Sequence, residues 1–350
     1  MRRISIIGTL TVALLFVVVG CGRGPSESGL DREVYLFNWG DYIEPAVLAD
    51  FTRKFGVRVV QDNFASNEDL LAKLQAGGVG YDVIVPSDYM VEVMIKEGLL
   101  EELDKKNLPN LRHIGARHLG LPYDPENRYC VPYLWGTTGL AYDADKVSRP
   151  ESWWVLWDVT YRGQISMLND QREALAVALR LLGHPINSTD PTELEAAKTL
   201  LQRQKVLVRT YNSENYDQLL LQGEVVLAHA WNGDVAKVAE EKPSLKYVIP
   251  REGGTVFHDN LCIPRTSRRV GTAETFINYL LRPDVAAQIV RYTMQASPNE
   301  AARSHLPQSI LENRAVYPSS EMMARLEAIR DVGQSLVLYD RIWTEIKAHR

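Results

Sequence analysis

The fold is decided by the stretch VYLFNWGDYIEPAVLADFTRKFGVRVV, which occupies residues 34–60. Its first four residues form an apolar run, which is typical of a buried strand. Residues 45–54 then carry apolar side chains at helical spacing, and Gly56 follows them as a helix stop. Residues 57–60 are rich in valine, which again favours a strand. A strand, a helix and a second strand in this order predict an α/β fold with a parallel sheet.

The same alternation continues along most of the chain. Ser66 and Asp69 can cap a helix at residues 66–76, and a buried strand at 82–86 and a helix at 89–97 follow it. After Tyr142 the alternation restarts, and the expected elements are helices at 172–182, 193–204 and 216–222, a strand at 225–229 and a helix from 233. Beyond its N-terminal segment the chain has about 320 residues, which exceeds the size at which one hydrophobic core keeps growing. We therefore expect two α/β domains.

The N-terminus predicts export. Met1, Arg2 and Arg3 precede an uncharged run at residues 4–19, which is too short to span a bilayer and is typical of a signal peptide. The run ends at Gly20 and Cys21 in a pattern that resembles the bacterial lipobox, although a cysteine at this place can also arise by chance. The resemblance implies cleavage after residue 20, acylation of Cys21 and a flexible tether at residues 21–32. Two or more acyl chains hold a protein stably at a membrane.

Composition favours a soluble domain behind this anchor, since 45% of the residues are hydrophobic and 24% are charged. Loss of residues 1–20 removes two arginines and no acid, which moves the formal charge from −5 to −7. An acidic excess argues against nucleic acid as a partner and permits a cationic ligand. Cys130 and Cys262 can pair in an exported protein, but both lie in apolar, strand-like runs. Buried free thiols are therefore the preferred interpretation.

Aromatic and acidic residues recur together where strands are expected to end. Such segments are residues 38–42, 86–89, 133–137, 168–173, 230–234 and 257–259. A single tryptophan there can pack between domains, and Asp170 can serve only as a helix N-cap. Ligands of open α/β sheets bind beyond the carboxyl ends of strands, so the repeated pairing points to a ligand site. Aromatic faces cover methylenes and attract cations, and carboxylates offset the burial of ammonium groups. This combination suits a linear polyamine.

From about residue 34 to near the C-terminus, the sequence is similar to the spermidine/putrescine-binding proteins of polyamine ABC transporters. The segments that carry the resemblance are residues 37–43, 81–89, 133–138, 169–173, 231–233 and 250–261. The resemblance implies a two-lobed periplasmic-binding fold of type II, in which the chain crosses between lobes near Thr138 and near Phe257. The implied parts are an N-terminal lobe of residues 33–138 plus 259–303 and a C-terminal lobe of residues 139–258 plus 304–350. Hinge closure around the ligand is implied as well.

The resemblance also implies the ligand site. The expected ligand-binding residues are Trp39, Asp41, Tyr42, Ser87, Asp88, Tyr89, Asp170, Glu173, Trp231, Phe257, Asp259 and Gln295. The sequence departs from the family pattern at Phe257, Gln295 and Ile329, where the family has tryptophan, tyrosine and glutamine. These departures put the preference for spermidine or putrescine in doubt rather than the ligand class. The implied partners are a polyamine and the permease subunits of an importer, and we expect an extracytoplasmic monomer without cofactor, metal or nucleic acid.

Three other functions stay open. An enzyme could use Asp170 and Glu173 as a carboxylate pair. A ferric-ion-binding protein of the same fold could use Tyr42 and Tyr89 as oxygen donors. A lipoprotein of this kind could also sense polyamines or act as an adhesin. No catalytic motif is evident, and we interpret His229 and His258 as hydrogen-bonded structural residues near the cleft.

Overall fold

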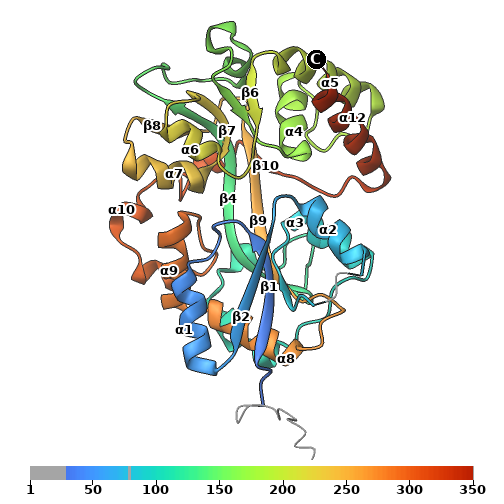
Figure 1. The fold of residues 1–350 in the computed structure, drawn as a ribbon, viewed down its shortest axis with the longest axis vertical. Coiled ribbons are helices and arrows are strands. Elements are labelled where there is room, and N and C mark those ends of the chain that lie inside the picture. Colours follow the sequence, from blue (N-terminus) through green and yellow to red (C-terminus); the bar gives the residue numbers. More distant parts are fainter. Residues whose placement is uncertain (1–28, 78–79, 350) are drawn as a thin grey trace, which may run out of the picture.

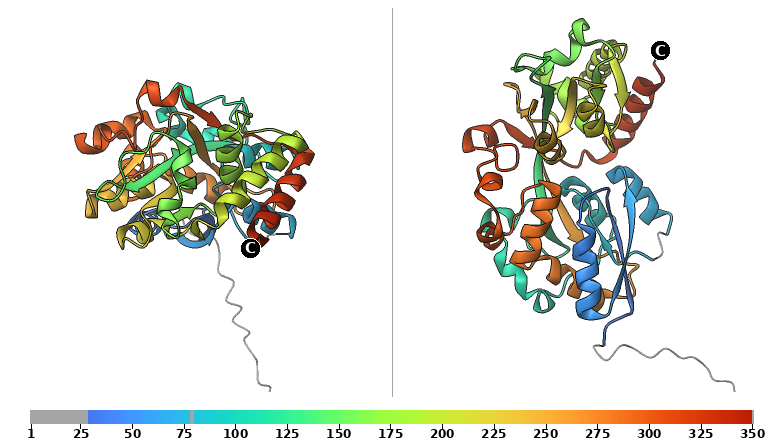
Figure 2. Two further views of the ribbon diagram at one scale, coloured as in Figure 1. Left: turned by 90° about the horizontal axis from the view of Figure 1, so that it is seen from above. Right: turned by 60° about the vertical axis from the view of Figure 1, so that its left-hand side comes forward.

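The computed structural model describes residues 29–77 and 80–349, which form two lobes stacked end to end (Figure 1). Two long antiparallel strands, β4 (Cys130–Asp143) and β9 (Gly254–Cys262), run through both lobes and connect them. A view from another side shows the same stacking, with the chain drawn in blue at the base and the C-terminal helix at the top (Figure 2). The α/β class and the two-lobed type are therefore as predicted.

The lower lobe is built on residues 34–60, which the sequence predicts to form a strand, a helix and a strand. β1 (Glu33–Trp39) pairs in parallel with β2 (Arg58–Phe64) on one side and with the short β3 (Val83–Ile84) on the other. Apolar residues at helical spacing bury one face of each covering helix against this sheet. The helices of this lobe are α1 (Pro45–Phe55), α2 (Asn67–Gln75), α3 (Asp88–Lys96), α8 (Val270–Leu280) and α9 (Pro283–Thr293). The bounds of α1, α2 and α3 agree with the predicted helices to within a few residues, whereas α8 and α9 were not predicted.

The upper lobe repeats the plan. β5 (Ile165–Met167) lies between β6 (Val208–Tyr211) and β7 (Leu227–Trp231), parallel to both, and β7 pairs antiparallel with β4. The remaining strands are β8 (Leu245–Val248), which pairs with β4, and β10 (Leu326–Ala328), which pairs with β9. The remaining helices are α4 (Gln171–Leu181), α5 (Pro191–Lys205), α6 (Tyr216–Leu221), α7 (Asn232–Glu241), α10 (Gln308–Leu311), α11 (Ser320–Met323) and α12 (Leu336–Ala348).

The sheet differs in one respect from the parallel sheet that the alternation predicts. Its order is β2-β1-β3-β9-β4-β7-β5-β6, and every pair that involves β4, and the pair of β3 with β9, is antiparallel. The reason is that β4 and β9 run through both lobes in opposite directions, so they join two parallel halves into one mixed sheet. The prediction holds for each half and fails at the connection.

The predicted crossing between the lobes lies in the ladder of β4 and β9, where the two backbones approach closely. Thr138 and Thr255 are Cα partners in this ladder, as are Gly136 and Phe257. A Cβ atom on Gly254 would lie 2.2 Å from the carbonyl oxygen of Thr138, which is impossible without backbone movement. Glycine is therefore required at residue 254. The chain positions at which one lobe gives way to the other stay a prediction.

Two further expectations concern cysteines and the membrane. Cys130 and Cys262 are free and fully buried, which agrees with the preferred interpretation of buried free thiols. They lie opposite one another in the ladder of β4 and β9. The expected signal peptide and the expected lipid-bearing Cys21 lie outside the described residues. Within residues 29–77 and 80–349, no helix combines the length and the apolar character that crossing a membrane requires.

Candidate functional site

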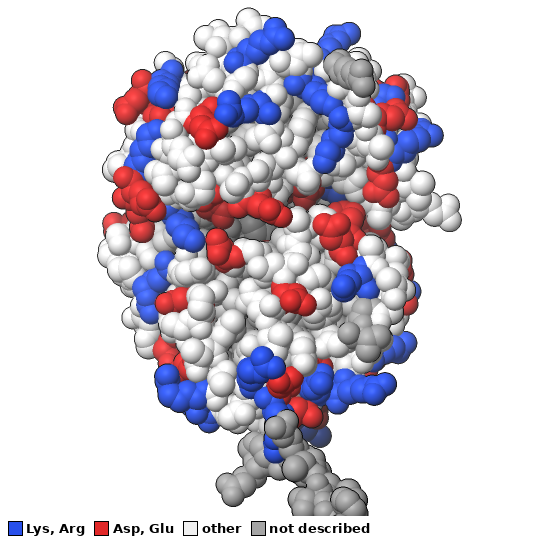
Figure 3. Space-filling model, viewed as in Figure 1, with Lys and Arg blue, Asp and Glu red and all other residues white. Residues whose placement is uncertain are grey.

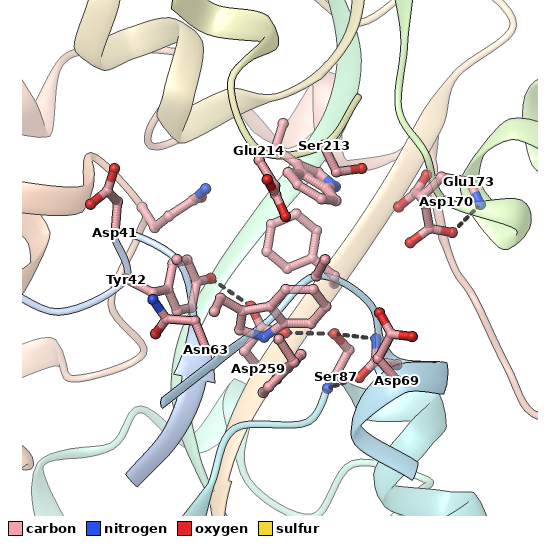
Figure 4. A pocket seen from close by; sticks show the side chains of 18 of the residues that line it. Asp41, Tyr42, Asn63, Asp69, Ser87, Asp170, Glu173, Ser213, Glu214 and Asp259 are labelled. Atoms are coloured by element: carbon pink, nitrogen blue, oxygen red, sulfur yellow. Dashed lines mark hydrogen bonds between the residues drawn. The ribbon is translucent and has the colours of Figure 1, made fainter. Parts of the chain in front are cut away.

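A cavity of about 940 Å³ lies between the lobes and is lined by side chains from both of them (Figure 4). Acidic residues gather along the hollow between the lobes on the face shown in Figure 3. The structure brings all twelve sequence-predicted site residues to this one cavity, and Ile329 lines it as well. Their contact with a ligand stays a prediction.

Aromatic rings of the two lobes meet at the centre of the cavity. The indole N–H of Trp39, at the end of β1, donates to the carbonyl oxygen of Val85 (2.9 Å), which fixes the ring. Trp231, at the end of β7, lies across from it with a ring separation of 6.3 Å in edge-on contact. The cavity thus has an apolar wall from each lobe.

Asp259 lies on β9 below these rings and is held by two hydroxyl groups. Tyr42 donates to its Oδ2 at 2.5 Å, and Ser87 donates to its Oδ1 at 2.6 Å. The amide of Asn67 binds both the hydroxyl and the backbone N–H of Ser87, so the donor is itself oriented. Burial raises the pKa of Asp259 to about 6, while the two hydroxyl donors oppose the rise. The carboxylate is therefore positioned before any ligand enters, and it has lone pairs left for an ammonium group.

Asp170 and Glu173 form the upper acidic wall at the start of α4. Asp170 caps the helix by accepting from the backbone N–H groups of Arg172 (2.9 Å) and Glu173 (3.0 Å), so its role as an N-cap is confirmed. Glu173 accepts from the hydroxyls of Thr138 and Thr255, both at 2.8 Å. Burial, together with the charge of Asp170, raises the pKa of Glu173 to about 8. Two desolvated carboxylates at one end of the cavity favour a cation there.

The cavity contains acids that the sequence analysis missed. Asp62, Asp69, Glu214, Asp217 and Asp234 line it in addition to the predicted set. Asp234 was visible in the sequence, because it ends one of the quoted strand-end segments. Glu214 follows β6, whose mixed burial gives no apolar run and therefore no strand signal.

Tyr89 and Gln295 occupy the remaining walls. Tyr89 is buried, donates its hydroxyl to Glu68 (3.0 Å) and lies below the guanidinium of Arg172, which is 5.4 Å from its ring. Gln295 is 3% exposed, and among the described residues its Oε1 has no hydrogen-bond partner. This oxygen is buried against Gly136 of β4, since a Cβ atom on that glycine would lie 2.5 Å from it. Phe257 lines the cavity near this point.

The two histidines behave differently from one another. His258 is hydrogen-bonded to His118 (3.2 Å), as a structural role requires. His229 is fully buried, but neither of its ring nitrogens has a partner among the described residues, so its interpretation as a hydrogen-bonded residue is wrong. It instead meets Trp153 edge-on at 5.3 Å. Within the described residues, no group of three histidine, cysteine or acidic side chains is arranged to hold a metal ion.

Comparison with known proteins places this geometry in a family. The model of the bacterial extracellular solute-binding proteins matches residues 46–309. The spermidine/putrescine-binding periplasmic protein of Salmonella typhimurium is 36% identical, with 94% of this chain and 95% of that protein covered.

Solved structures agree. A Listeria monocytogenes protein has a TM-score of 0.89 at 32% identity, covering 91% of this chain and 100% of its own. A Treponema pallidum lipoprotein has a TM-score of 0.80 at 29% identity, covering 90% of this chain and 99% of its own. The resemblance found in the sequence is thereby confirmed, and the chain belongs to the family of bacterial extracellular solute-binding proteins.

Proposed function

We propose that this protein captures a linear polyamine, spermidine or putrescine, outside the cytoplasm and delivers it to the permease subunits of an ABC importer. The observation that carries the proposal is the cavity between the lobes, where carboxylates stand at separate points along walls of aromatic rings. The name of the Salmonella relative supports the same ligand class. No chemical conversion of the ligand is part of this function.

The twelve predicted residues act as ligand contacts. Glu173 and Asp259 lie on opposite sides of the cavity and each meets an ammonium group, because a buried ammonium without a carboxylate is costly. Trp39 and Trp231 cover the methylene chain between these points and add cation–π attraction. Since the contacts come from both lobes, the ligand binds the closed form better than the open form, and this difference drives hinge closure.

The protein is held at the membrane by a lipid on Cys21 and acts as a monomer. The lipobox-like sequence before Cys21 supports the anchor, and the structurally similar Treponema pallidum protein is a lipoprotein. Residues 21–32 then serve as a tether. The lobes comprise residues 33–138 plus 259–303 and residues 139–258 plus 304–350.

Iron binding is the nearest alternative, and the hydroxyl groups of Tyr42 and Tyr89 argue against it. Each donates to its own carboxylate, Asp259 and Glu68 respectively. Burial raises the pKa of both tyrosines, which opposes the tyrosinate that ferric ion requires. Iron would be revealed by a visible tyrosinate charge-transfer band. Transport is distinguished from sensing by whether a neighbouring gene encodes a permease.

Titration calorimetry of the mature protein tests the proposal. We expect one site per chain for spermidine and for putrescine, and no heat from glucose, free amino acids or Fe(III). Heat from a sugar or from iron, with none from either polyamine, would overturn the proposed function.

A further inference from the structure

A chain of side chains leads from the protein surface to the ligand cavity. The exposed Arg117 donates from Nε to His118 Nε2 (3.0 Å), and His118 Nδ1 lies 3.2 Å from His258 Nε2. His258 Nδ1 faces Oδ2 of Asp88 at 4.0 Å. Asp88 lines the cavity, whereas the other three residues stand behind its wall.

The contacts fix the proton on each imidazole ring. An arginine side chain can only donate, so His118 Nε2 must accept. A neutral imidazole has one N–H, so His118 carries it on Nδ1 and donates to His258 Nε2. His258 then carries its own proton on Nδ1, the nitrogen that faces Asp88. Both rings are neutral at pH 7, because burial lowers the pKa of His118 to about 3 and that of His258 to about 4.

Trp135 holds this arrangement together. Its ring lies 5.6 Å from the ring of His118 and is stacked on that of His258 at 6.3 Å, with 22° between the two planes. The guanidinium of Arg117 lies over the same indole at 5.9 Å. Among the described residues, no carboxylate is within salt-bridge distance of Arg117. The positive charge of Arg117 therefore acts on the two histidines and is not neutralised by a described acid nearby.

Asp88 needs such a donor, because it is 5% exposed and its surroundings are mostly acidic. Asp259 on β9 and Glu173 on α4 act on it with like charge, Tyr123 lies near it, and Arg330 of the C-terminal segment is the cation that faces it. Burial, with a further contribution from Asp259, raises its pKa to about 8. Its Oδ1 accepts the backbone N–H of Tyr89 at 2.9 Å, the carboxylate also accepts the backbone N–H of His258, and its Oδ2 faces the His258 imidazole.

We propose that Arg117, His118 and His258 are positioning residues that orient the carboxylate of Asp88 and favour its ionised form, which makes Asp88 an ammonium site for a triamine. This inference rests on the proposed function and adds a specificity-determining site to it. No proton moves along the chain, since each stays on its own donor nitrogen. When a cationic ligand enters, Asp88 releases its proton to solvent, and its 4.0 Å contact with His258 Nδ1 shortens to a hydrogen bond.

The tautomers can be tested without any ligand. Nitrogen-15 NMR of histidine-labelled protein at pH 7 distinguishes an Nδ1–H ring, an Nε2–H ring and a charged ring. We expect His118 and His258 both to be neutral Nδ1–H tautomers. In the variant Arg117→Met, which keeps an apolar side chain over Trp135 but has no donor, His118 should lose this preference. Finding His258 as an Nε2–H tautomer or as a cation in the unmodified protein would overturn the proposal.

A double-mutant cycle tests the effect on the ligand. We expect Arg117→Met to weaken spermidine binding by about fivefold, because it removes one charge-assisted hydrogen bond from the chain. In an Asp88→Asn background the same change should alter affinity by less than about twofold, since the carboxylate that it serves is gone. Arg303→Met is the matched control, because Arg303 lies over the ring of Tyr317, which itself contacts Trp135.

Equal losses in both backgrounds would show that Arg117 acts only through packing and would overturn the inference. That result would leave the proposed function intact as long as the unmodified protein binds spermidine. Absence of polyamine binding in the unmodified protein would instead overturn the proposed function.

Discussion

Thr255 on β9 donates its hydroxyl to the carboxylate of Glu173 on α4 at 2.8 Å, beside the predicted crossing between the lobes. Its Cα partner Thr138 on β4 donates to the same carboxylate. Glu173, which lines the cavity, thus accepts hydrogen bonds from both β4 and β9, the strands that connect the lobes. A ligand charge placed on Glu173 therefore acts directly on the hinge, which gives the closed form a specific contact to stabilise.

Glu173→Gln and Asp259→Asn should each weaken polyamine binding by about 2–5 kcal/mol, because each leaves an ammonium group uncompensated in a closed cleft. Fold stability should change little, since the amides are of similar size. The amide oxygen still accepts from a neighbouring hydroxyl, and a hydroxyl that faces the amide NH2 can turn to accept from it. Titration calorimetry and thermal unfolding of the same samples measure both effects. Glu240→Gln, at an exposed position on α7, is the matched control. Unchanged affinity in either cavity variant would show that its acid only caps or packs.

Polyamine affinity should rise with pH between about 5.5 and 8.5. Burial raises the pKa of Glu173 and of Asp88 to about 8 and that of Asp259 to about 6, so these acids are protonated at the low end of the range. They ionise as pH increases, while the amines of the ligand stay charged up to about pH 9.

The stability of the ligand-free protein should change in the opposite direction. A carboxyl whose pKa is raised by folding stabilises the folded state below its unfolded pKa and loses this contribution as pH rises through the folded value. The melting temperature without ligand should therefore fall across this range, and the increase caused by spermidine should grow. Thr255→Val removes a donor to Glu173 and should shift the affinity curve to higher pH. An affinity that is flat with pH would contradict this account.

Gly254→Ala should destabilise the protein strongly, because its Cβ would lie 2.2 Å from the Thr138 carbonyl oxygen. We expect a loss of at least about 3 kcal/mol in the free energy of unfolding, as for other severe backbone conflicts. Gly271→Ala is the control, because Gly271 lies in α8 with nothing within 4 Å of a Cβ atom. That substitution should stabilise by about 0.5–1 kcal/mol. Chemical denaturation of both variants decides the matter.

Cys21→Ala should leave the domain folded but without its lipid, so that the protein is either released in soluble form or kept uncleaved with its signal peptide. The physical reason is that the thiol of Cys21 is the group that would carry the lipid. Radiolabelled palmitate incorporation and cell fractionation measure this. Normal cleavage together with continued labelling of the alanine variant would refute the lipid anchor.

The predicted acidic and aromatic residues lie at one cavity for a geometric reason. Trp39 and Trp231 end strands that point toward the same cleft, so local strand signals were enough to bring them together. His118 could not be found this way. It lies in a short 3-10 helix outside the sheet, and only the packing of Trp135 brings it to His258.

Local sequence signals also could not predict the conformation of the central part of β4. Gly136 and Gly139 flank the predicted crossing near Thr138, and the structure continues as strand through both residues. Glycine is used there because the side chains of Asn232 and Tyr247 come within 2.4 and 2.7 Å of where their Cβ atoms would be. Such a requirement is set by tertiary contacts and is invisible in local sequence.

Spermidine and putrescine should bind with dissociation constants within about tenfold of one another, or about 1.4 kcal/mol. Phe257 and Ile329 supply less cation attraction and hydrogen bonding than the tryptophan and glutamine of the family pattern, which narrows selectivity. Asp88 acts in the opposite direction, because it offers a carboxylate to a third ammonium group.

Competition of each amine against labelled putrescine measures the balance of these two effects. Asp88→Asn should therefore weaken spermidine more than putrescine, and Ile329→Gln should favour spermidine, because it restores a hydrogen-bonding group at the cavity wall. A preference beyond a hundredfold in the unmodified protein would show that one effect dominates, and these two variants would identify which residue is responsible.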